Sequence, residues 1–495
     1  MITHNKAAAA SVRQTSAANR RTFLGDAGMG FAGLALSAIL AEDGHTAQPA
    51  AAPIGVIHRP AKAKSVIWLF LAGGVSHMES FDIKPALNQY AGKTFAETPF
   101  ADFLDKERIE KNLMGQGMTI PAHKELMPLQ TGYRRYGECG LEVGDWFSHI
   151  GECADDLAVV RSLWTVHPNH GMQLTWHTGH HVREGAQPTI GSWASYGLGS
   201  LNQQLPKFIV MGNSIGGCCG GEFGHGASYL GPHHAGVKLS TDLGDPLPFV
   251  APHGNGTTAE EQAAELELIG KLNRAVGVDY PEDPDLRARI RSYELAAGMQ
   301  TAVPRIMNFS GETAHTQSLY GLDEEHSRPF GTQCLAARRL VENGVRFVQL
   351  YHGTGSAGTW DGHSDIKRKY DIEAPKVDKP IAGLLRDLKQ RGLLDTTLVV
   401  FGTEFGRTPG AQGGTGRDHH PQGFMCWLAG GGIRGGITHG ATDELGFYAV
   451  EDPHYVTDIH ATVLHQLGID PRQLGVPGRK RIDAHRGKPI TEIIA

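Results

Sequence analysis

Carboxylates and histidines follow several apolar runs of this sequence at the point where each run ends. The run Val345–Tyr351 is followed by Asp361 and His363, and Thr396–Phe401 is followed by Glu404. Carboxylate oxygens and imidazole nitrogens together are typical ligands of borderline divalent cations such as Zn²⁺, Mn²⁺ or Fe²⁺. The residue types and their places therefore predict a metal site.

Further groups that could belong to this site stand close by in the sequence. Asp418 and His419 come soon after Glu404, His77 follows the first apolar run, and Arg407 could pair with a carboxylate or with a tetrahedral anion. Each of these side chains alone is equally typical of a turn cap, a solvated loop or an ordinary ion pair. As a set they indicate a site only if the runs that precede them end at one edge of one sheet.

A second group of histidines lies in the segment 162–181. It holds five imidazoles within 15 positions: His167, His170, His177, His180 and His181. In a helix, residues 170 and 177 would lie two turns apart on one face. A surface run of histidines without a ligand explains the segment equally well, and both interpretations stay open.

The elements that must position these residues alternate along the chain. Short continuous apolar runs predict strands, as expected when both faces of a sheet are covered, at residues 65–72, 157–161, 207–212, 345–351, 396–401 and 424–429. Helical patterns cover residues 190–198, 258–276, 284–300, 332–342, 378–391 and 455–467. This order predicts an α/β fold with a mostly parallel sheet, whose strands present their carboxyl ends at one edge. Residues 402–423 read as a Gly-rich loop, and residues 213–330 as long loop and helical insertions.

Composition excludes some classes of function. The chain has 495 residues, 40% of them hydrophobic and 20% charged, with a formal net charge of −6. No Lys/Arg-rich face or tail indicates a nucleic-acid partner. The six cysteines show no CxxC spacing, and the vicinal pair Cys218-Cys219 reads as loop sequence rather than as a redox pair.

The N-terminal residues 1–46 are predicted to be a targeting segment, followed by a linker over residues 47–64 and one domain over residues 65–495. Residues 19–24, NRRTFL, form a twin-arginine pattern ahead of the weakly apolar run Gly25–Ala41. The expectation is export to the periplasm or the outside, with no membrane span after cleavage. An uncleaved anchor is the alternative, since the run has about the shortest length that crosses a bilayer.

Four motifs in order carry a resemblance to a known family. WLFLAGGVSHMESFDIKP, VRSLWTVHPNHGMQ, LVVFGTEFGRTP and GRDHHP, together with the leader, resemble the domain-of-unknown-function 1501 family of exported bacterial proteins. That family in turn is similar to a distant branch of the alkaline phosphatase and sulfatase superfamily. The resemblance implies a sheet with helices on both faces, one or two divalent ions (Zn, Mn, Fe or Ca) at the strand ends, and hydrolysis of a phosphate or sulfate ester of a small molecule or glycan.

Carried over by position, the superfamily pattern is only partly present. Its first strand ends on a metal-binding Asp, where this chain has Gly73-Gly74, and its nucleophile position falls on Asn169. No cysteine begins the sulfatase motif, so a formylglycine nucleophile is excluded. Either metal-bound water attacks, or His170 acts as a covalent nucleophile or general acid, or the chain binds without hydrolysis.

Two hypotheses follow. The first is an exported metal-dependent ester hydrolase in which Asp361, His363, Glu404, His419, Asp418 and His77 are the candidate ligands, and His170, Arg407 and Asn169 the candidate catalytic residues. The second is a binding or scaffold protein that keeps the fold without the chemistry.

Overall fold

The computed structural model describes residues 58–104, 125–213, 216–241, 261, 264–265, 267–272, 284–355, 357–476 and 487–495. The chain divides into two units, Met1–Ala47 and Gln48–Ala495, and every described residue belongs to the second. The predicted targeting segment and most of the linker therefore lie outside the described residues. Within the described part of the chain, no helix is both long and apolar enough to cross a membrane.

A nine-stranded sheet forms the centre of this unit, in the order β12-β4-β11-β8-β1-β7-β5-β6, with β15 also paired to β4. The pairs of β11 with β4 and β8 are antiparallel and the other pairs are parallel. The sheet is thus mostly parallel, as predicted. Its strands are β1 (Ser65–Leu71), β4 (Leu157–Trp164), β5 (Phe208–Met211), β6 (Val237–Leu239), β7 (Phe347–His352), β8 (Thr397–Gly402), β11 (Phe424–Ala429), β12 (Ile437–His439) and β15 (His454–Tyr455).

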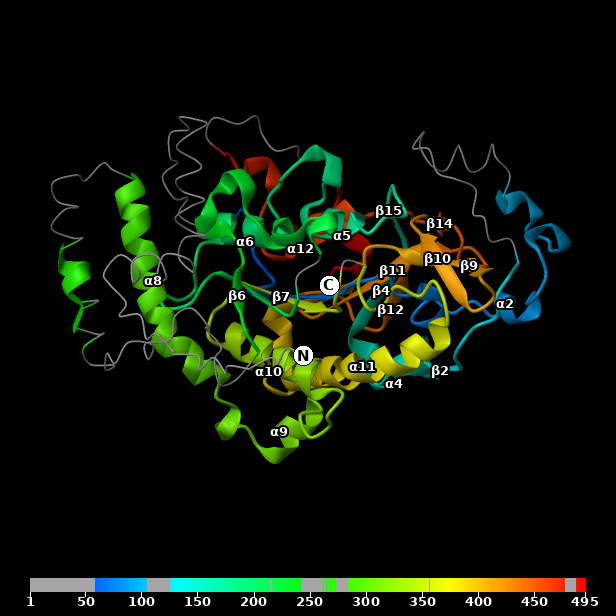
Figure 1. Ribbon diagram of the computed structural model, residues 1–495, viewed down its shortest axis with the longest axis horizontal. Coiled ribbons are helices and arrows are strands. Elements are labelled where there is room, and N and C mark those ends of the chain that lie inside the picture. Colours follow the sequence, from blue (N-terminus) through cyan, green and yellow to red (C-terminus); the bar gives the residue numbers. More distant parts are fainter. Residues whose placement is uncertain are drawn as a thin grey trace, which may run out of the picture. The chain divides into compact units, whose positions relative to one another are not determined.

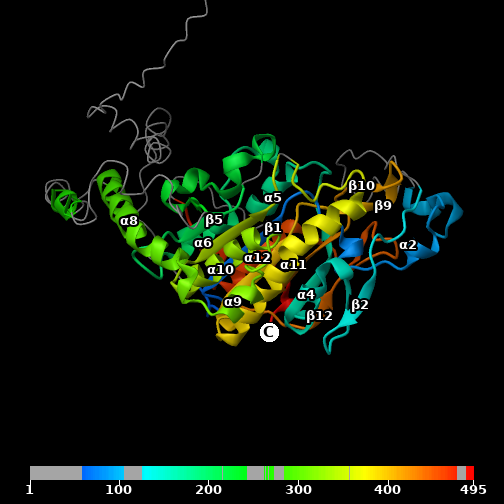
Figure 2. The ribbon, with the colours of Figure 1, turned by 60° about the horizontal axis from the view of Figure 1, so that its bottom comes forward.

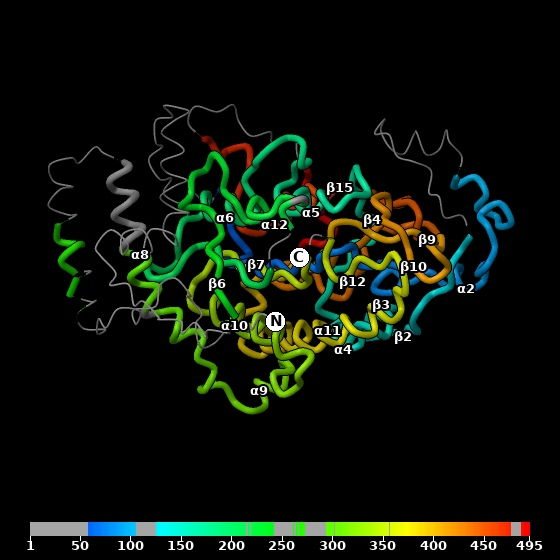
Figure 3. The backbone as a smooth tube through the Cα atoms, in the orientation of Figure 1, coloured from blue at the N-terminus to red at the C-terminus, as the bar shows by residue number. Residues whose placement is uncertain are grey.

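The central strand β1 shows why these runs are continuously apolar. Alternate side chains of β1 enter two different hydrophobic clusters, Ile67 and Leu69 in one and Trp68 and Phe70 in the other. Both faces of the sheet are covered, so neither set of side chains meets water. In Figure 3 the blue trace of β1 lies in the middle of the unit, and its two neighbours, β7 and β8, come from much later in the chain.

Helices cover both faces of the sheet, as predicted (Figures 1 and 2). One face carries α4 (Ser148–Gly151), α8 (Pro284–Met307), α10 (Arg328–Glu342) and α11 (Ile366–Gln390), and the other carries α5 (Met172–Thr178), α6 (Ile190–Leu198) and α12 (Val456–Gln466). The helix predicted at residues 378–391 starts earlier, at Ile366, because α11 continues through Pro375 and Pro380. The helix predicted at residues 258–276 falls largely outside the described residues.

Smaller elements surround this core. They are the helices α2 (Ala86–Gln89) and α9 (Ala314–Leu319) and the strand pairs β2 (Tyr133–Tyr136) with β3 (Leu141–Gly144), and β13 (Ala441–Thr442) with β14 (Ala449–Glu451). Within residues 213–330, predicted to be loop and helical insertions, β6 forms a strand that joins the sheet beside β5.

The segment predicted as a Gly-rich loop after β8 is instead a hairpin. Strand β9 (Gly406–Gln412) pairs antiparallel with β10 (Gly416–His420), and Figure 1 shows the two strands together beyond the sheet. The sequence lacks the alternation and the β-branched residues that mark a strand. The pairing is supported from outside, because Met127 N–H donates to Pro409 O at 3.0 Å and Leu126 bridges to Gly410.

Candidate metal centre

The carboxyl ends of β1, β4, β7 and β8 lie at one edge of the sheet, because these four strands run in the same direction. The chain leaving β7 carries Asp361 and His363, the chain leaving β8 carries Glu404, and the chain leaving β4 carries His170. The hairpin that follows β8 adds His419. The sequence predicted that Asp361, His363, Glu404 and His419 converge, and it gave His170 separately as a catalytic candidate. The structure brings all five side chains together.

Asp361 is the centre of the group. Its Oδ1 lies 3.1 Å from His363 Nε2 and 3.0 Å from His419 Nε2, and it accepts from Arg407 Nη2 at 2.8 Å. Its Oδ2 lies 3.4 Å from His170 Nε2. Burial alone would raise the pKa of this carboxyl, but hydrogen bonds from the imidazoles in their protonated form and the charge of Arg407 outweigh it and hold the pKa well below its usual range. Asp361 is therefore an anion among nitrogen atoms.

Each of the three imidazoles has its other nitrogen, Nδ1, next to an oxygen. The Nδ1 of His170 lies 2.9 Å from Glu404 Oε1, that of His419 lies 2.8 Å from Pro168 O, and that of His363 contacts Gln412 Oε1. Carbonyl and carboxylate oxygens only accept, so Nδ1 carries the proton and a neutral ring leaves a lone pair on Nε2. All three Nε2 atoms face Asp361, and those of His363 and His419 are 2.9 Å apart.

This donor set fits a borderline divalent cation. Three imidazole nitrogens and one carboxylate are a familiar ligand combination for such ions. An oxygen acceptor behind each imidazole is the arrangement that fixes the tautomer of metal-bound histidines. Two compact groups of possible ligands share His419, one with His170 and Asp361 and the other with His363 and Asp418.

The protonation of the imidazoles reflects the same contacts. Burial lowers the pKa of His170, but the carboxylates of Asp361 and Glu404 outweigh it and raise that pKa to about 9. The hydrogen bond to Asp361 raises the pKa of His363, whereas burial lowers the pKa of His419. Without a metal, the cluster thus holds a proton on His170.

Glu404 stands behind the cluster. Its side chain is completely buried, and it accepts from Gly73 N–H at 3.0 and 3.1 Å and from Gln173 Nε2 at 3.1 Å, in addition to His170. Gly73 has φ +125°, and a Cβ there would lie 2.5 Å from the backbone nitrogen of Asp361. A glycine at this position lets the first strand end donate a backbone N–H to Glu404 while Asp361 passes close by.

Arg407 is also completely buried. Its Nε donates to Gly74 O at 2.7 Å, its Nη1 to Arg417 O at 3.1 Å, and its Nη2 to Gly73 O and Asp361 Oδ1. All three guanidinium nitrogens thus already have acceptors within the protein. The contacts place Arg407 as the partner that holds Asp361, beneath the cluster rather than on its open side.

The remaining candidate residues lie around the cluster or apart from it. Asp418 Oδ1 is 3.6 Å from His363 Nδ1, on the more exposed side. Asn169 is exposed, and its Oδ1 accepts from Gly171 N–H at 2.8 Å. His77 is fully buried with its Nε2 2.8 Å from Gly446 O, and it belongs to neither group of possible ligands.

Sequence reasoning did not find three partners of the imidazoles and of Glu404: the carbonyl of Pro168, Gln412 and Gln173. A backbone carbonyl carries no signal in the residue type, and a Gln in a Gly-rich stretch resembles any loop residue. The short spacing between Asn169, His170 and Gln173 was the one available hint, because it places Gln173 one helical turn beyond His170.

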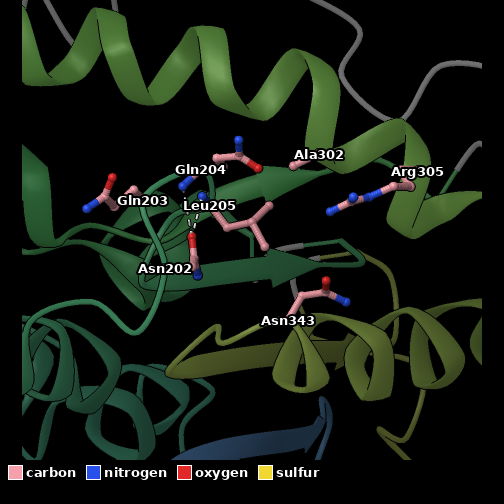
Figure 4. Close-up of a pocket in the computed structure, with 7 residues that line it drawn as sticks. All are labelled: Asn202, Gln203, Gln204, Leu205, Ala302, Arg305 and Asn343. Atoms are coloured by element: carbon pink, nitrogen blue, oxygen red, sulfur yellow. Dashed lines mark hydrogen bonds between the residues drawn. The ribbon is translucent and has the colours of Figure 1, made fainter.

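A hollow of about 340 Å³ lies elsewhere in the unit and shares no lining residue with the cluster (Figure 4). There Asn202 Oδ1 accepts from the backbone N–H groups of Gln204 and Leu205 at 3.0 and 2.6 Å. Its lining is formed by Asn202, Gln203, Gln204, Leu205, Ala302, Arg305 and Asn343. With no carboxylate or imidazole in its lining, this hollow offers none of the ligand chemistry of the cluster.

A family model described as a protein of unknown function, DUF1501, matches residues 63–494. No curated protein matches the sequence.

Similar solved structures include a sulfatase from Pseudoalteromonas sp. (12% identity, TM-score 0.33, covering 89% of this chain and 72% of that one). A phosphonate monoester hydrolase from Silicibacter pomeroyi (11%, 0.34, 70% and 71%) and an alkaline phosphatase from the Antarctic bacterium TAB5 (12%, 0.30, 75% and 92%) are also similar. With identities and TM-scores this low, the function has to be argued from the residues of the site.

Proposed function

This chain belongs to the DUF1501 family, and we propose that it is an exported, metal-dependent hydrolase of a phosphate or sulfate ester, such as one carried by a glycan. The observation that supports this most strongly is the convergence of three imidazole Nε2 atoms on Asp361, each with its Nδ1 fixed by an oxygen. Holding these nitrogen atoms together around one carboxylate costs free energy in the absence of a cation, and the same arrangement is ready to bind a divalent cation.

His170, His363, His419 and Asp361 are the proposed ligands, and Asp418 is a further ligand if a second ion binds. A bound divalent ion supplies a Lewis acid for the ester oxygen and lowers the pKa of a water molecule toward neutrality. The substrate approaches from the side of His363 and Asp418, because their side chains are each 36% exposed while those of His170 and His419 are 14% and 12% exposed.

His170 acts as a ligand rather than as a covalent nucleophile in this proposal. Its two ring nitrogens lie against the carboxylates of Glu404 and Asp361, so neither is turned toward an incoming ester. Asn169 cannot attack a phosphorus or sulfur centre, and it lies at the rim. The attacking group is therefore water.

Metal content and turnover test the proposal directly. Purified mature protein is expected to contain stoichiometric Zn, Mn, Fe or Ca and to hydrolyse p-nitrophenyl phosphate or sulfate with the matching ion added. His363→Ala should remove both the metal and the turnover, whereas Asn202→Ala, in the unrelated hollow, should remove neither. A wild-type protein that binds no metal and keeps its melting temperature in chelator would contradict the proposal.

Glu404→Ala distinguishes a supporting role from a ligand role. In the proposal Glu404 orients His170, and loss of such a partner weakens metal binding by about 10- to 100-fold. Glu404→Gln should retain part of the affinity, because an amide oxygen still accepts from His170 Nδ1–H. Equal and complete loss in both variants would indicate that Glu404 is itself a ligand.

A non-catalytic binding protein is the second candidate function, and the position of Arg407 favours it. The arginine expected to grip a tetrahedral anion is buried and points at the protein. A metal-loaded protein that turns over no phosphate or sulfate ester, but binds a glycan in an affinity gel, would support this alternative and contradict hydrolysis.

Export by the twin-arginine route completes the proposal, supported by the NRRTFL pattern ahead of an apolar run. Replacement of Arg20 and Arg21 by lysine should leave the precursor in the cytoplasm of the producing cell. Unchanged export of this variant would contradict the route.

A further inference from the structure

A completely buried ion pair joins the hairpin to the first strand end. Arg417, on β10, donates from Nε and Nη2 to Glu79 Oε1 at 2.9 and 2.6 Å, and both side chains are 0% exposed. Ser76 Oγ donates to the other carboxylate oxygen. Burying two charges is costly unless hydrogen bonds complete their shells, so the remaining N–H groups of Arg417 are informative.

Those N–H groups bind backbone carbonyls of two segments. Nη1 donates to Thr408 O at 3.1 Å and to Pro409 O at 2.9 Å. Nη2 also donates to Met127 O at 3.2 Å and to Pro128 O at 3.0 Å. One guanidinium thus connects β9, the segment at residues 127–128 and Glu79.

The carbonyls of Thr408 and Pro409 belong to an irregularity in the hairpin. Arg417 pairs with Ala411 and His419 pairs with Arg407, so the register advances two residues on β10 and four on β9. The two extra residues of β9 form a bulge. A bulge next to a site typically re-aims a side chain, and here it moves His419 opposite Arg407 instead of opposite Pro409.

This shift brings His419 to Asp361. Arg407 Nη2 lies 2.8 Å from Asp361 Oδ1, and His419 Nε2 reaches the same oxygen at 3.0 Å. The backbone of Arg417 takes part as well, because its N–H donates to Gly362 O at 2.9 Å and its carbonyl accepts from Arg407 Nη1 at 3.1 Å. Arg417, which binds the bulge through its side chain, thus also contacts Gly362 and Arg407 through its backbone, and these residues adjoin Asp361.

We infer that the buried Glu79–Arg417 pair is a positioning device for the metal centre, which holds the β9 bulge so that His419 faces Asp361. Glu79 and Arg417 touch no reacting atom in this scheme. The inference rests on the proposed metal centre for its consequence, but the orientation of His419 can be measured without a metal.

An apolar replacement of the whole pair tests the inference. Glu79→Leu combined with Arg417→Met removes both charges, which often leaves a fold as stable as before, and circular dichroism with thermal unfolding verifies this. The affinity for Zn²⁺ is expected to fall by about 10- to 100-fold, and the visible spectrum of the Co²⁺-loaded protein is expected to change. A stable double variant with wild-type Zn²⁺ affinity and an unchanged Co²⁺ spectrum would overturn the inference.

Arg417→Lys with Glu79 retained is the conservative variant. Lysine keeps the charge pair with Glu79 but cannot also reach the Thr408 and Pro409 carbonyls with a planar fork. The expected result is a folded protein with weakened Zn²⁺ affinity. Full wild-type affinity in this variant would show that the charge pair alone, and not the bound bulge, is what matters, and it would overturn the inference as stated.

A metal-free measurement separates failure of the inference from failure of the proposed function. In protein labelled with ¹⁵N-histidine, the Nδ1–H of His419, bonded to Pro168 O at 2.8 Å, is expected to exchange slowly in the wild type and fast in the double variant. Slow exchange in both would overturn the inference even if the wild type bound no metal. Wild-type protein that shows this difference but binds no Zn²⁺ would contradict the proposed function alone.

A control is available between α10 and α11. Arg338 and Asp387 form another buried pair, with Nε 2.9 Å from Oδ2 and side-chain exposures of 2% and 4%. Arg338→Met with Asp387→Leu is expected to leave the Zn²⁺ affinity and the His419 exchange rate unchanged. An equal loss of Zn²⁺ affinity in this control would show that the loss in the Glu79/Arg417 variant comes from general destabilisation, and it would overturn the inference.

Discussion

Two carboxylates at the same edge of the sheet are each paired with a buried arginine of the same hairpin. Asp361 accepts from Arg407 on β9, and Glu79 accepts from Arg417 on β10. Both arginines are 0% exposed. By residue type and pairing the two sites look alike.

They differ in what else faces the carboxylate. Besides Arg417, Glu79 accepts from the Ser76 hydroxyl, and its carboxylate is fully buried. The other neighbours of Asp361 are the Nε2 atoms of three imidazoles whose Nδ1 atoms each face an oxygen, and its side chain remains 14% exposed. A ligand site is thus recognised by unused lone pairs next to a carboxylate, and a structural ion pair by donors that already satisfy it.

The largest expected difference between the two sites is in metal binding after an isosteric change. Asp361→Asn removes the anion around which the imidazoles gather and places an amide N–H₂ group among their lone pairs. The affinity for Zn²⁺ should fall by more than about 100-fold, because a ligand contributes more than its supporting partner does. Elemental analysis and a competition titration measure this loss. If the Asp361→Asn protein retained stoichiometric metal, Asp361 would not be a metal ligand, and the proposed difference between Asp361 and Glu79 would be wrong.

The arginines allow a second test, in stability. Arg407→Met and Arg417→Met each leave a buried carboxylate without its partner, which costs about 3–5 kcal/mol of unfolding free energy. A cation bound at Asp361 replaces the lost charge of Arg407, but no cation site adjoins Glu79 among the described residues. Zn²⁺ stabilises every variant that still binds it, so the test compares the size of the gain. Saturating Zn²⁺ should therefore restore more of the unfolding free energy of Arg407→Met than of Arg417→Met, as urea denaturation with and without Zn²⁺ measures. Equal recovery in both variants would contradict the assignment of the cation to Asp361.

The third test is the dependence of the Zn²⁺ affinity on pH, and the expected change is smaller than in the first two tests. The pKa of His170 is raised to about 9 in the metal-free protein, by carboxylates that outweigh burial. His170 is then protonated between pH 6 and 8, and a metal must displace this proton to reach Nε2. The apparent Zn²⁺ affinity should rise by about tenfold per pH unit over that range. A competition titration at several pH values measures it, and an affinity independent of pH would exclude His170 as a ligand.

The sequence predicted the sheet well because its strands are buried on both faces. The runs of β1, β7 and β8 are apolar without interruption, and polar groups follow where they end. Parallel strands then bring those groups to one edge. Asp361, His363 and His419 were found by this argument, which requires no knowledge of the contacts, whereas His170 was predicted as a catalytic residue from the His-rich segment and the family resemblance.

The hairpin formed by β9 and β10, and the separate roles of the residues within the site, could not be predicted from strand patterns. Glu404 and Gly73 are 331 positions apart, yet the backbone N–H of Gly73 donates to both oxygens of the Glu404 carboxylate. A local pattern cannot show that such a carboxylate is already satisfied. The bulge in β9 depends in the same way on Arg417 and on the segment at residues 127–128, which no spacing rule connects.

His177 provides the smallest expected effect and the sharpest contrast among the histidines. It lies on α5, seven positions after His170, but it packs against the rings of Phe70 and Tyr351 at centroid distances of 4.6 and 5.2 Å. Neither of its ring nitrogens has a hydrogen-bond partner among the described residues. Burial, together with His460 and His225, lowers its pKa well below the usual value, so it is neutral.

An imidazole in this state contributes shape rather than chemistry, and a buried polar atom without a partner costs about 1–3 kcal/mol. His177→Leu is therefore expected to leave the Zn²⁺ content unchanged and to leave the free energy of unfolding unchanged or raise it by about 1 kcal/mol. His170→Leu, the matched change in the same segment, should lose the metal. If His177→Leu also lost the metal, the direction of the lone pairs would not separate ligand histidines from structural ones. The same rule would then also fail to separate Asp361, as a ligand, from Glu79, as part of a structural ion pair.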